Sequence, residues 1–287
     1  MKYFKLTFFL MIFIFIYIPL FSGTGVDSLG NKISIPDEGV KIVSLAPGAT
    51  EILYELGLQE EIVGISEFCN YPPELVASKP KMGGFSTPDI EKIQAENPDV
   101  IILTRTMPIQ VKYQFERLGM QLFVAEPKSL NELLKTIIQF GNLFNRVKEA
   151  HELVISMESR AGEITEAIRE RSTNPVRTMI IIWNKPYYTA SRKTLPGDIV
   201  QLAGGRIVPD TTQEYLLINE ERILQINPEA LILGHEIEMT DYRNIESIRA
   251  LRNNKVFLPN PDEFLRPGPR VINALTEIAH FLHPEAF

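Results

Sequence analysis

Hydrophobic and polar positions change their period several times along this chain. Between residues 41 and 126, short apolar runs such as KIVSL and VIIL alternate with segments of helical periodicity. The same order returns after residue 176, where VRTMIIIW precedes a helical segment, PGDIVQLAGG, at 196–205. Strands that alternate with helices are typical of α/β layers with parallel strands. The pattern therefore predicts an α/β fold with two such regions.

A different pattern separates the two regions. Between residues 146 and 171, apolar positions follow one another in steps of three and four: Val147, Ala150, Val154, Met157, Ala161, Ile164 and Ile168. One apolar stripe without proline predicts a single helix of roughly 39 Å, at about 1.5 Å per residue. A helix of this length can cross two lobes. A coiled-coil dimer is the alternative, but the stripe is short and contains two alanines, so we expect a monomer.

One short unit occurs twice. DIEKIQAENPDVIIL begins at residue 89 and NEERILQINPEALIL at residue 219, which is 130 positions later. A helix followed by Asn-Pro and a strand is a common connection and can recur by chance. However, Phe85 lies six residues before Glu91, and Tyr215 lies six residues before Glu221. We therefore expect two equivalent loops, whose aromatics face a cleft and whose glutamates mark its outer rim.

The N-terminus has the pattern of an export signal. Lys2 and Lys5 precede or flank an apolar run from Leu6 to Phe21, and small residues follow at 22–25. This order predicts a secretory signal over residues 1–25 and an exported, periplasmic or otherwise extracytoplasmic protein. An uncleaved membrane anchor is the alternative, although the run is short for a spanning helix.

Composition and charge exclude several classes of function. The net charge of −7 over 287 residues argues against a nucleic-acid partner. The single cysteine, Cys69, cannot form an internal disulfide or a cysteine-built zinc site. His280 and His283 lack a third ligand nearby, so we expect no metal site, and His235 is considered only as an axial ligand to a bound chelate. No catalytic motif is present, so we expect no enzyme, no catalytic residue and no cofactor.

Several ordered motifs resemble one protein family. They are KIVSLAPGATEILYELGL, VGISEFCNYPPE, GG-x6-E, NPDVII, LAGG and DEFLRPGPR. Together they resemble the periplasmic solute-binding proteins that deliver cobalamin and iron–siderophore complexes to ABC importers. SEFCNYPPE and FLRPGPR are closer to the cobalamin receptors than to the hydroxamate-siderophore receptors. The resemblance implies two Rossmann-like lobes joined by a single long α-helix, with the ligand in a cleft between the lobes.

The resemblance also implies site residues. Ligand contacts would come from Phe68, Phe85, Tyr215, Asp262, Glu263, Phe264, Leu265 and Arg266. Trp183 and Tyr188 follow a strand of the second lobe, where aromatic faces can join the cleft, although Trp183 fits a core position equally well. Glu91 and Glu221 would form salt bridges with arginines of the permease. The chain lacks the tryptophans and the cysteine pair of some relatives, which leaves the ligand open.

These observations give one expected organisation. A signal peptide covers 1–25, an N-terminal α/β lobe 26–145, a linker helix 146–172 and a C-terminal α/β lobe 173–287, with the family's binding domain over about 41–287. The expected function is capture of cobalamin, or a related corrinoid, for an ABC transporter permease in the inner membrane. A receptor for an iron–siderophore or haem is the first alternative. An exported enzyme on the same fold is the second.

Overall fold

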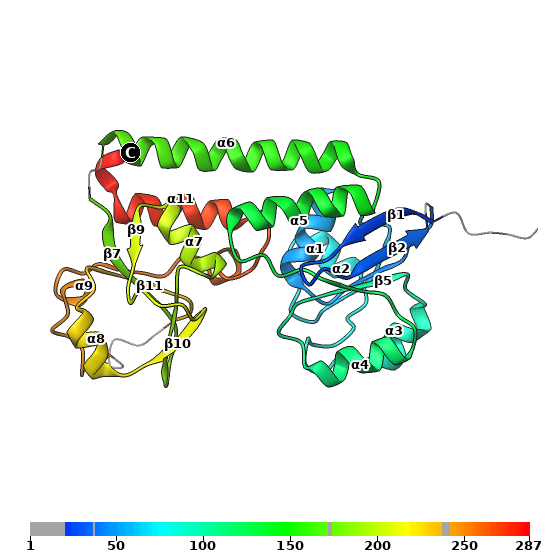
Figure 1. Cartoon of the computed structure of the whole chain (residues 1–287), viewed down its shortest axis with the longest axis horizontal. Coiled ribbons are helices and arrows are strands. Elements are labelled where there is room, and N and C mark those ends of the chain that lie inside the picture. Colours follow the sequence, from blue (N-terminus) through cyan, green and yellow to red (C-terminus); the bar gives the residue numbers. More distant parts are fainter. Residues whose placement is uncertain (1–20, 37, 172–173, 237–241) are drawn as a thin grey trace, which may run out of the picture.

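Two α/β lobes lie side by side along the long axis of the molecule. The computed structural model describes residues 21–36, 38–171, 174–236 and 242–287. One long helix, α6 (Val147–Arg171), runs along the same side of both lobes and joins them (Figure 1). The expected architecture of two lobes and one connecting helix is therefore present.

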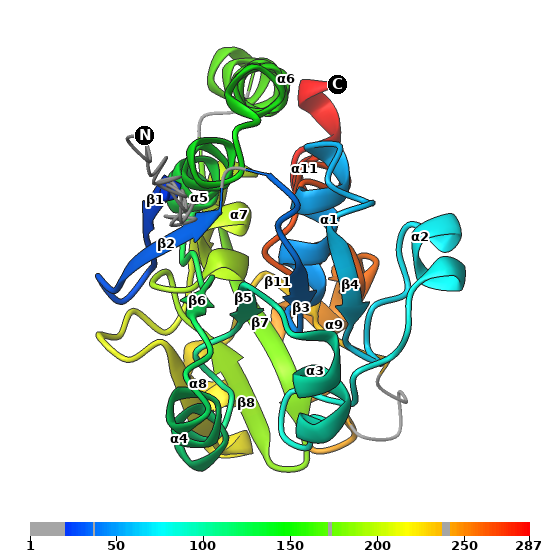
Figure 2. The same cartoon turned by 90° about the vertical axis from the view of Figure 1, so that its right-hand side faces the viewer.

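The N-terminal lobe is built on a parallel sheet. The sheet has the order β4-β3-β5-β6, with bounds β3 Ile42–Ser44, β4 Ile62–Ile65, β5 Val100–Leu103 and β6 Leu122–Val124. Its helices are α1 Pro47–Glu55, α2 Pro73–Ser78, α3 Ile90–Glu96, α4 Ile109–Arg117 and α5 Leu130–Leu143. Seen end-on, α1 and α5 lie on one side of the sheet and α3 and α4 on the other (Figure 2). Alternate residues of β5 accordingly pack into two different hydrophobic clusters.

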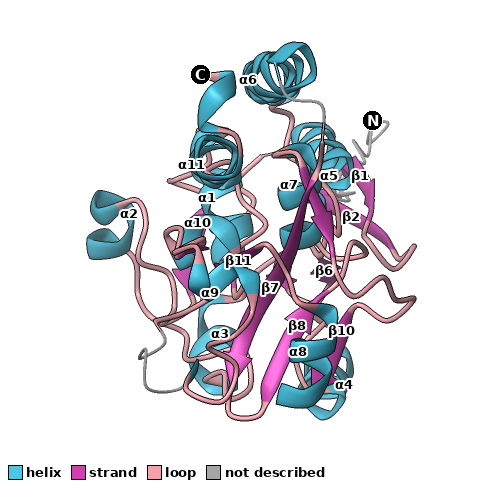
Figure 3. Cartoon of the chain, turned by 90° about the vertical axis from the view of Figure 1, so that its left-hand side faces the viewer, coloured by secondary structure: helices cyan, strands magenta, loops and turns pink. Residues whose placement is uncertain are grey.

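The C-terminal lobe has a mixed sheet, where the alternating pattern predicted parallel pairing. The order is β10-β8-β7-β11-β12, and β9 also pairs with β7. The bounds are β7 Val176–Asn184, β8 Tyr187–Ala190, β9 Gly205–Ile207, β10 Tyr215–Ile218, β11 Ala230–Leu233 and β12 Val256–Phe257. β8 pairs antiparallel with both β7 and β10 (Figure 3). Tyr215 therefore lies on a strand, and not on the loop expected from its counterpart Phe85.

The remaining helices complete the C-terminal lobe. They are α7 Leu195–Leu202, α8 Glu220–Ile226, α9 Arg249–Arg252, α10 Pro261–Phe264 and α11 Val271–Leu282, followed by a 3₁₀ turn at Pro284–Ala286. Alternate residues of β11 pack against different clusters, as those of β5 do in the other lobe. The two lobes thus repeat one layered plan.

Most of the apolar stripe of α6 is buried, and Val154 is half-buried. Ala150, Met157, Ala161, Ile164 and Ile168 are buried, while Val147 at the start of the helix is exposed. The stripe packs on α5 of one lobe and α11 of the other, and a single hydrophobic cluster contains residues of both lobes and of α6. The helix therefore belongs to the core of both lobes.

The duplicated unit has the same local structure in both lobes. Asp89 and Asn219 cap α3 and α8 by accepting hydrogen bonds from the backbone N–H three residues later. Both helices end at an asparagine in the left-handed region, with φ/ψ of 49°/61° at Asn97 and 49°/64° at Asn227. Asparagine adopts this region more easily than other non-glycine residues do. The sequence repeat is therefore a repeat of backbone geometry.

A β-hairpin forms the first described part of the chain. β1 (Phe21–Val26) pairs antiparallel with β2 (Lys32–Pro36), and Gly30 in the turn has a positive φ of 87°. Residues 21–25, assigned above to the signal segment, thus form most of β1. Residues 1–20, which carry most of the predicted signal, lie outside the described part of the chain.

Candidate ligand-binding site

A small cavity lies where the two lobes meet. Its volume is about 190 Å³. It is lined by N-lobe residues that follow β5 and β6 and by C-lobe residues near α7, β10 and α10, among them Thr104, Glu126, Lys128, Glu214, Tyr215 and Leu265. The carboxyl ends of parallel strands are where open α/β sheets bind ligands. Small-molecule sites usually measure about 300–1,000 Å³, so this cavity can hold only part of a large ligand.

Two predicted aromatics form an exposed pair on the N-terminal lobe. The ring centroids of Phe68 and Phe85 are 5.7 Å apart, and the rings are tilted by 44°. Both side chains are exposed. A Cβ at Gly84 would lie 3.0 Å from the Phe68 ring and 2.6 Å from the Glu67 carboxylate, so glycine permits this close approach. We call Phe68 and Phe85 the N-lobe aromatic pair.

The C-terminal lobe carries a row of exposed apolar side chains. Trp183 of β7 pairs in register with Tyr188 of β8, which pairs with Leu217 of β10. Directly opposed residues share one face of a sheet, and all three are exposed, with Trp183 at 54%. Tyr215 lies two residues before Leu217 and therefore on the same face. Trp183 is thus a surface residue and not part of the core. We call Trp183, Tyr188, Tyr215 and Leu217 the C-lobe aromatic row.

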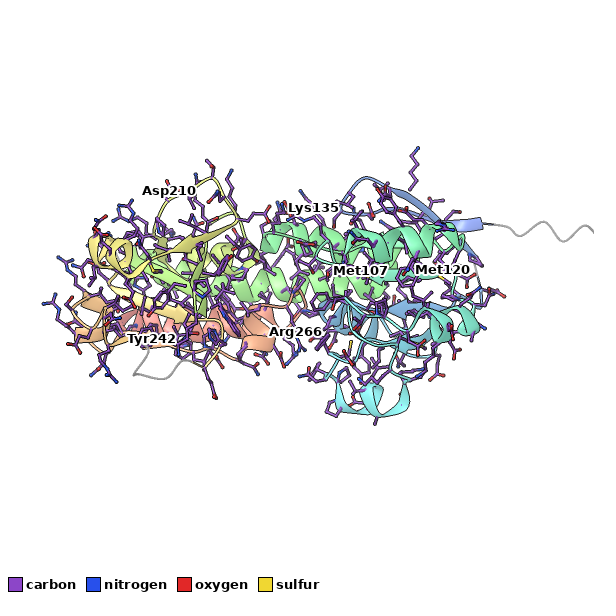
Figure 4. All side chains as sticks on the ribbon, turned by 90° about the horizontal axis from the view of Figure 1, so that it is seen from below. Met107, Met120, Lys135, Asp210, Tyr242 and Arg266 are labelled. Carbon is purple, nitrogen blue, oxygen red and sulfur yellow. The ribbon has the colours of Figure 1, made fainter. Side chains whose placement is uncertain are left out.

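The segment before the last helix divides between core and cleft. Leu265 lines the inter-lobe cavity, and Arg266 lies between the lobes (Figure 4). Phe264 is 0% exposed within the main hydrophobic cluster. The predicted ligand contact at Phe264 is therefore wrong for this structure, because the side chain has no surface to offer. Asp262 and Glu263 instead accept hydrogen bonds within the protein, Asp262 from Asn70 at 2.6 Å and Glu263 from Arg270 at 3.2 Å.

One polar cluster joins the lobes beside the N-lobe aromatic pair. Asn70 donates to Asp262 at 2.6 Å and accepts from Arg266 at 2.6 Å. Glu51, which is 3% exposed, accepts two hydrogen bonds from Arg270, at 2.9 and 2.7 Å. Burial raises the pKa of the Glu51 carboxyl, although the hydrogen bonds from Arg270 act in the opposite direction. Asn70 and Glu51 belong to the N-terminal lobe, and their partners to the C-terminal lobe.

A second polar cluster crosses the seam at the cavity itself. Glu214 of the C-terminal lobe accepts from Arg105 at 2.7 Å and from Lys128, both in the N-terminal lobe. Arg105 also pairs with Glu126, at 3.3 Å. The hydrogen bond from Lys128 is the main reason that the pKa of Glu214 is lowered. We call Arg105, Glu126, Lys128 and Glu214 the seam charge cluster.

The comparisons with known proteins agree with this architecture. The model of the periplasmic binding protein family matches residues 42–262. The chain belongs to the periplasmic binding protein family. A relative in Bacillus subtilis, the uncharacterized ABC transporter substrate-binding lipoprotein YvrC, is 27% identical over 91% of this chain and 85% of its own. Members of this kind are substrate-binding proteins of ABC importers, and they are not enzymes.

Two solved structures show the range of ligands among similar members. The periplasmic vitamin B12-binding protein BtuF of Vibrio cholerae is 25% identical, with a TM-score of 0.75, over 85% of this chain and 97% of that chain. IsdE of Staphylococcus aureus, solved with haem, has a TM-score of 0.75 over 85% of this chain and 99% of that chain. Its identity of 23% shows the common fold alone. The family and fold predictions are therefore confirmed, while the ligand is not decided.

The two rim glutamates of this binding protein occupy equivalent places. Glu91 and Glu221 are exposed residues in the first turns of α3 and α8. α3 and α8 lie in different lobes on the side opposite α6 (Figure 1). The two glutamates therefore belong to helices on one side of the molecule, one in each lobe.

His235 of the binding protein is held beside the C-lobe aromatic row. Its ring stacks on Trp183 with centroids 4.8 Å apart, and its Nε2 lies 3.2 Å from the Asn184 side-chain oxygen. Its Nδ1 is buried. Neither nitrogen is presented to the cleft in this arrangement. Within the described residues, no cluster of three metal-binding side chains is present, and no helix is long and apolar enough to cross a membrane.

Aromatics that are exposed in the structure could be selected from the sequence, but the seam charge cluster was missed. Arg105 lies two residues after the end of β5, and Lys128 lies in the loop after β6. Polar residues after adjacent parallel strands were the available signal, because those strand ends meet at one edge of the sheet. Nothing in the sequence indicates that Glu214, more than 80 residues away, joins both cations. Leu217 was missed because β10 was not predicted.

Proposed function

We propose that this protein captures cobalamin or a related corrinoid outside the cytoplasm and delivers it to the permease of an ABC importer. The observation that carries the proposal is that both lobes have exposed aromatic side chains, of which Tyr215 lines the inter-lobe cavity. The N-lobe aromatic pair supplies one wall, and the C-lobe aromatic row supplies the other. Similarity to the B12-binding protein of Vibrio cholerae supports the choice of ligand.

Aromatic walls suit a large, flat chelate for physical reasons. Each aromatic side chain can bury about 150–250 Å² while it loses little conformational freedom. The rings can therefore cover both sides of a corrin with few residues. Leu265 and Tyr215 at the cavity would contact the part of the ligand that reaches between the lobes. Arg266 and Asp262 would contact its polar edge.

Delivery requires a surface that the permease can hold. We propose that Glu91 and Glu221 dock on basic residues of the permease, one from each lobe. Exposed charges mainly steer the encounter and fix orientation. Two separated carboxylates define one pose more strictly than a single carboxylate does.

Haem or an iron–siderophore is the second candidate ligand. The observation that favours haem is the imidazole of His235, which is placed beside the exposed Trp183. Coordination of iron would require His235 to give up its contact with Asn184 and to turn one nitrogen outward. A corrinoid held by aromatic faces requires no such rearrangement, so we place it first.

Export belongs to the same proposal. The basic start and the apolar run of the N-terminus favour secretion with removal of the signal. Cleavage ahead of Phe21 would keep β1 whole, whereas cleavage after residue 25 would leave only its last residue. Intact mass measurement of the exported chain would distinguish these two sites from a retained anchor.

The ligand can be tested by fluorescence, because Trp183 is the single tryptophan of the chain. The exported protein is titrated with cyanocobalamin, with haemin and with a ferric hydroxamate. All three titrations are compared by the ligand concentration that gives half-maximal quenching. We expect this concentration to be lowest for cyanocobalamin, since its absorbing ring would lie against Trp183. Saturation by the ferric hydroxamate or haemin with no response to the corrinoid would overturn the choice of ligand.

Matched variants locate the binding surface in the same assay. Tyr188→Ala removes a ring from the C-lobe aromatic row, and Tyr113→Ala removes another exposed tyrosine ring, from α4. We expect weaker corrinoid binding for Tyr188→Ala and unchanged binding for Tyr113→Ala. Equal affinities of the two variants would place the ligand elsewhere.

A further inference from the structure

The seam charge cluster contains two cations and two carboxylates at the wall of the inter-lobe cavity. Three of its four members, Glu126, Lys128 and Glu214, line that cavity. Arg105 and Lys128 come from the N-terminal lobe, and the carboxylate between them comes from the C-terminal lobe. The cations are therefore occupied by a group of the protein itself, at the place where a ligand would meet them.

Contribution to stability is a weak reason for this arrangement. The four side chains are between 23% and 43% exposed. Ion pairs at such exposed positions usually contribute little to folding. Arginine and lysine in a cleft are, by contrast, strong binders of carboxylate and phosphate groups. We therefore expect the seam charge cluster to affect which charged groups of a ligand the cleft can bind, more than it affects folding.

Glu214 is charged when the ligand arrives. Its pKa is lowered, first by the hydrogen bond from Lys128 and also by the charge of Arg105, so the carboxylate is ionised at neutral pH. The described charges of the cluster then cancel. An anionic ligand group that approaches Arg105 meets the carboxylates of Glu126 and Glu214, which already hold that cation.

We propose that Glu214 sets the charge preference of the cleft, because it holds Arg105 and Lys128 and so disfavours metal chelates with several carboxylates. The inference rests on the proposed function, since it concerns the same cleft. It narrows the ligand class to chelates of small net charge whose periphery is amide rather than carboxylate. The competing explanation is that Glu214 only ties the lobes together, in which case its loss would affect all ligands alike.

The test compares two corrins that differ in peripheral charge. Cyanocobalamin carries amides around the ring, and dicyano-cobyrinic acid carries carboxylates in their place. The wild-type chain and Glu214→Gln are titrated with both. We expect Glu214→Gln to bind the carboxylate corrin roughly tenfold more tightly, because removal of a close like charge changes affinity by about this factor. Binding of cyanocobalamin should change less than about threefold.

Two further variants control the comparison. Glu166→Gln removes an ion-paired carboxylate from the exposed side of α6, where Glu166 pairs with Arg169, and should leave both affinities unchanged. Addition of Arg105→Gln to Glu214→Gln should abolish the gain, since the freed cation is its cause. The gain should also shrink at high salt.

The outcomes separate this inference from the function on which it rests. An equal change for both corrins would overturn the charge preference and leave Glu214 as a tie between lobes. No change for either would overturn it as well. If the wild-type chain binds neither corrin and the variant does not either, both the proposed function and this inference fail.

Discussion

The five residues from Asp262 to Arg266 show how finely core and cleft are divided. Phe264 is fully buried, its neighbour Leu265 lines the inter-lobe cavity, and Asp262 and Arg266 pair with each other at 2.7 Å. The chain makes a short helical turn here, so adjacent side chains leave it in different directions. A contiguous stretch of family contacts therefore cannot be carried over residue by residue without knowledge of the turn.

Substitution of Phe264 tests its assignment to the core. Phe264→Ala should lower the free energy of unfolding by about 3–5 kcal/mol, because a buried ring leaves a cavity. Phe264→Leu keeps more volume and should lower it less. Phe85→Ala, which removes an exposed ring, should stay within about 1 kcal/mol of wild type. Urea denaturation measures the free energy of unfolding of all three variants. Equal values for Phe264→Ala and Phe85→Ala would contradict the assignment of Phe264 to the core.

The exposed aromatic residues could be selected from the sequence, whereas the ion pairs of Glu214 could not. Phe68, Phe85, Trp183, Tyr188 and Tyr215 are all exposed in the structure, as ligand contacts should be. Their selection used motif positions and strand ends, which are visible in a sequence. The pairing of Glu214 with Arg105 and Lys128 depends on how the two lobes approach, which no local pattern encodes. Whether the aromatics contact ligand stays a prediction.

At the scale of elements, the repeated helix–strand unit gives a test of its asparagine caps. Asn97 and Asn227 both adopt a left-handed conformation after their helices. Replacement by alanine should cost about 1–2 kcal/mol at either site, since alanine adopts this conformation poorly. Replacement by glycine removes that strain. Asn97→Gly should therefore retain wild-type stability.

The two sites should differ when glycine is introduced. The side chain of Asn227 also accepts a hydrogen bond from the backbone N–H of Arg249, at 2.8 Å. Asn227→Gly loses this bond, so its thermal midpoint should fall below that of Asn97→Gly. Thermal unfolding of the four single variants measures the difference. Identical midpoints for the two glycine variants would show that the bond to Arg249 contributes nothing.

Elements could be predicted where their apolar pattern was long or repeated, whereas β8 and β10 were missed. The 25-residue helix α6 and the repeated units were predicted from apolar spacing. β8 and β10 have four residues each and read as aromatic loops. Their antiparallel pairing is a tertiary event that offers no signal of its own. β1 was assigned in part to the signal segment because its residues follow the apolar run without a break.

At the scale of the whole molecule, both rim glutamates act together if they dock on a permease. Reversal of both, Glu91→Lys with Glu221→Lys, should leave corrinoid affinity intact and abolish uptake by cells that depend on the importer. The reason is that both residues are exposed and lie in helices away from the seam cavity. Growth on limiting corrinoid and titration of the purified variant measure the two effects.

A matched control uses the opposite side of the molecule. Glu158→Lys with Glu170→Lys makes the same change of net charge on exposed positions of α6. Cells with this variant should take up corrinoid normally if uptake depends on the position of the two glutamates and not on the net charge of the protein. Normal uptake by the Glu91 and Glu221 variant would remove the docking role.

The placement of α6 also decides how the molecule can be held for observation. Gly162 lies on the exposed side of this helix, and a Cβ added there meets nothing within 4 Å. Cys69, the single thiol of the chain, is buried. Gly162→Cys would therefore create one accessible handle for a maleimide linker. A molecule tethered to glass through this residue would present the side that carries α3 and α8 to the solution. Binding of a nanodisc that contains the permease could then be measured on that side.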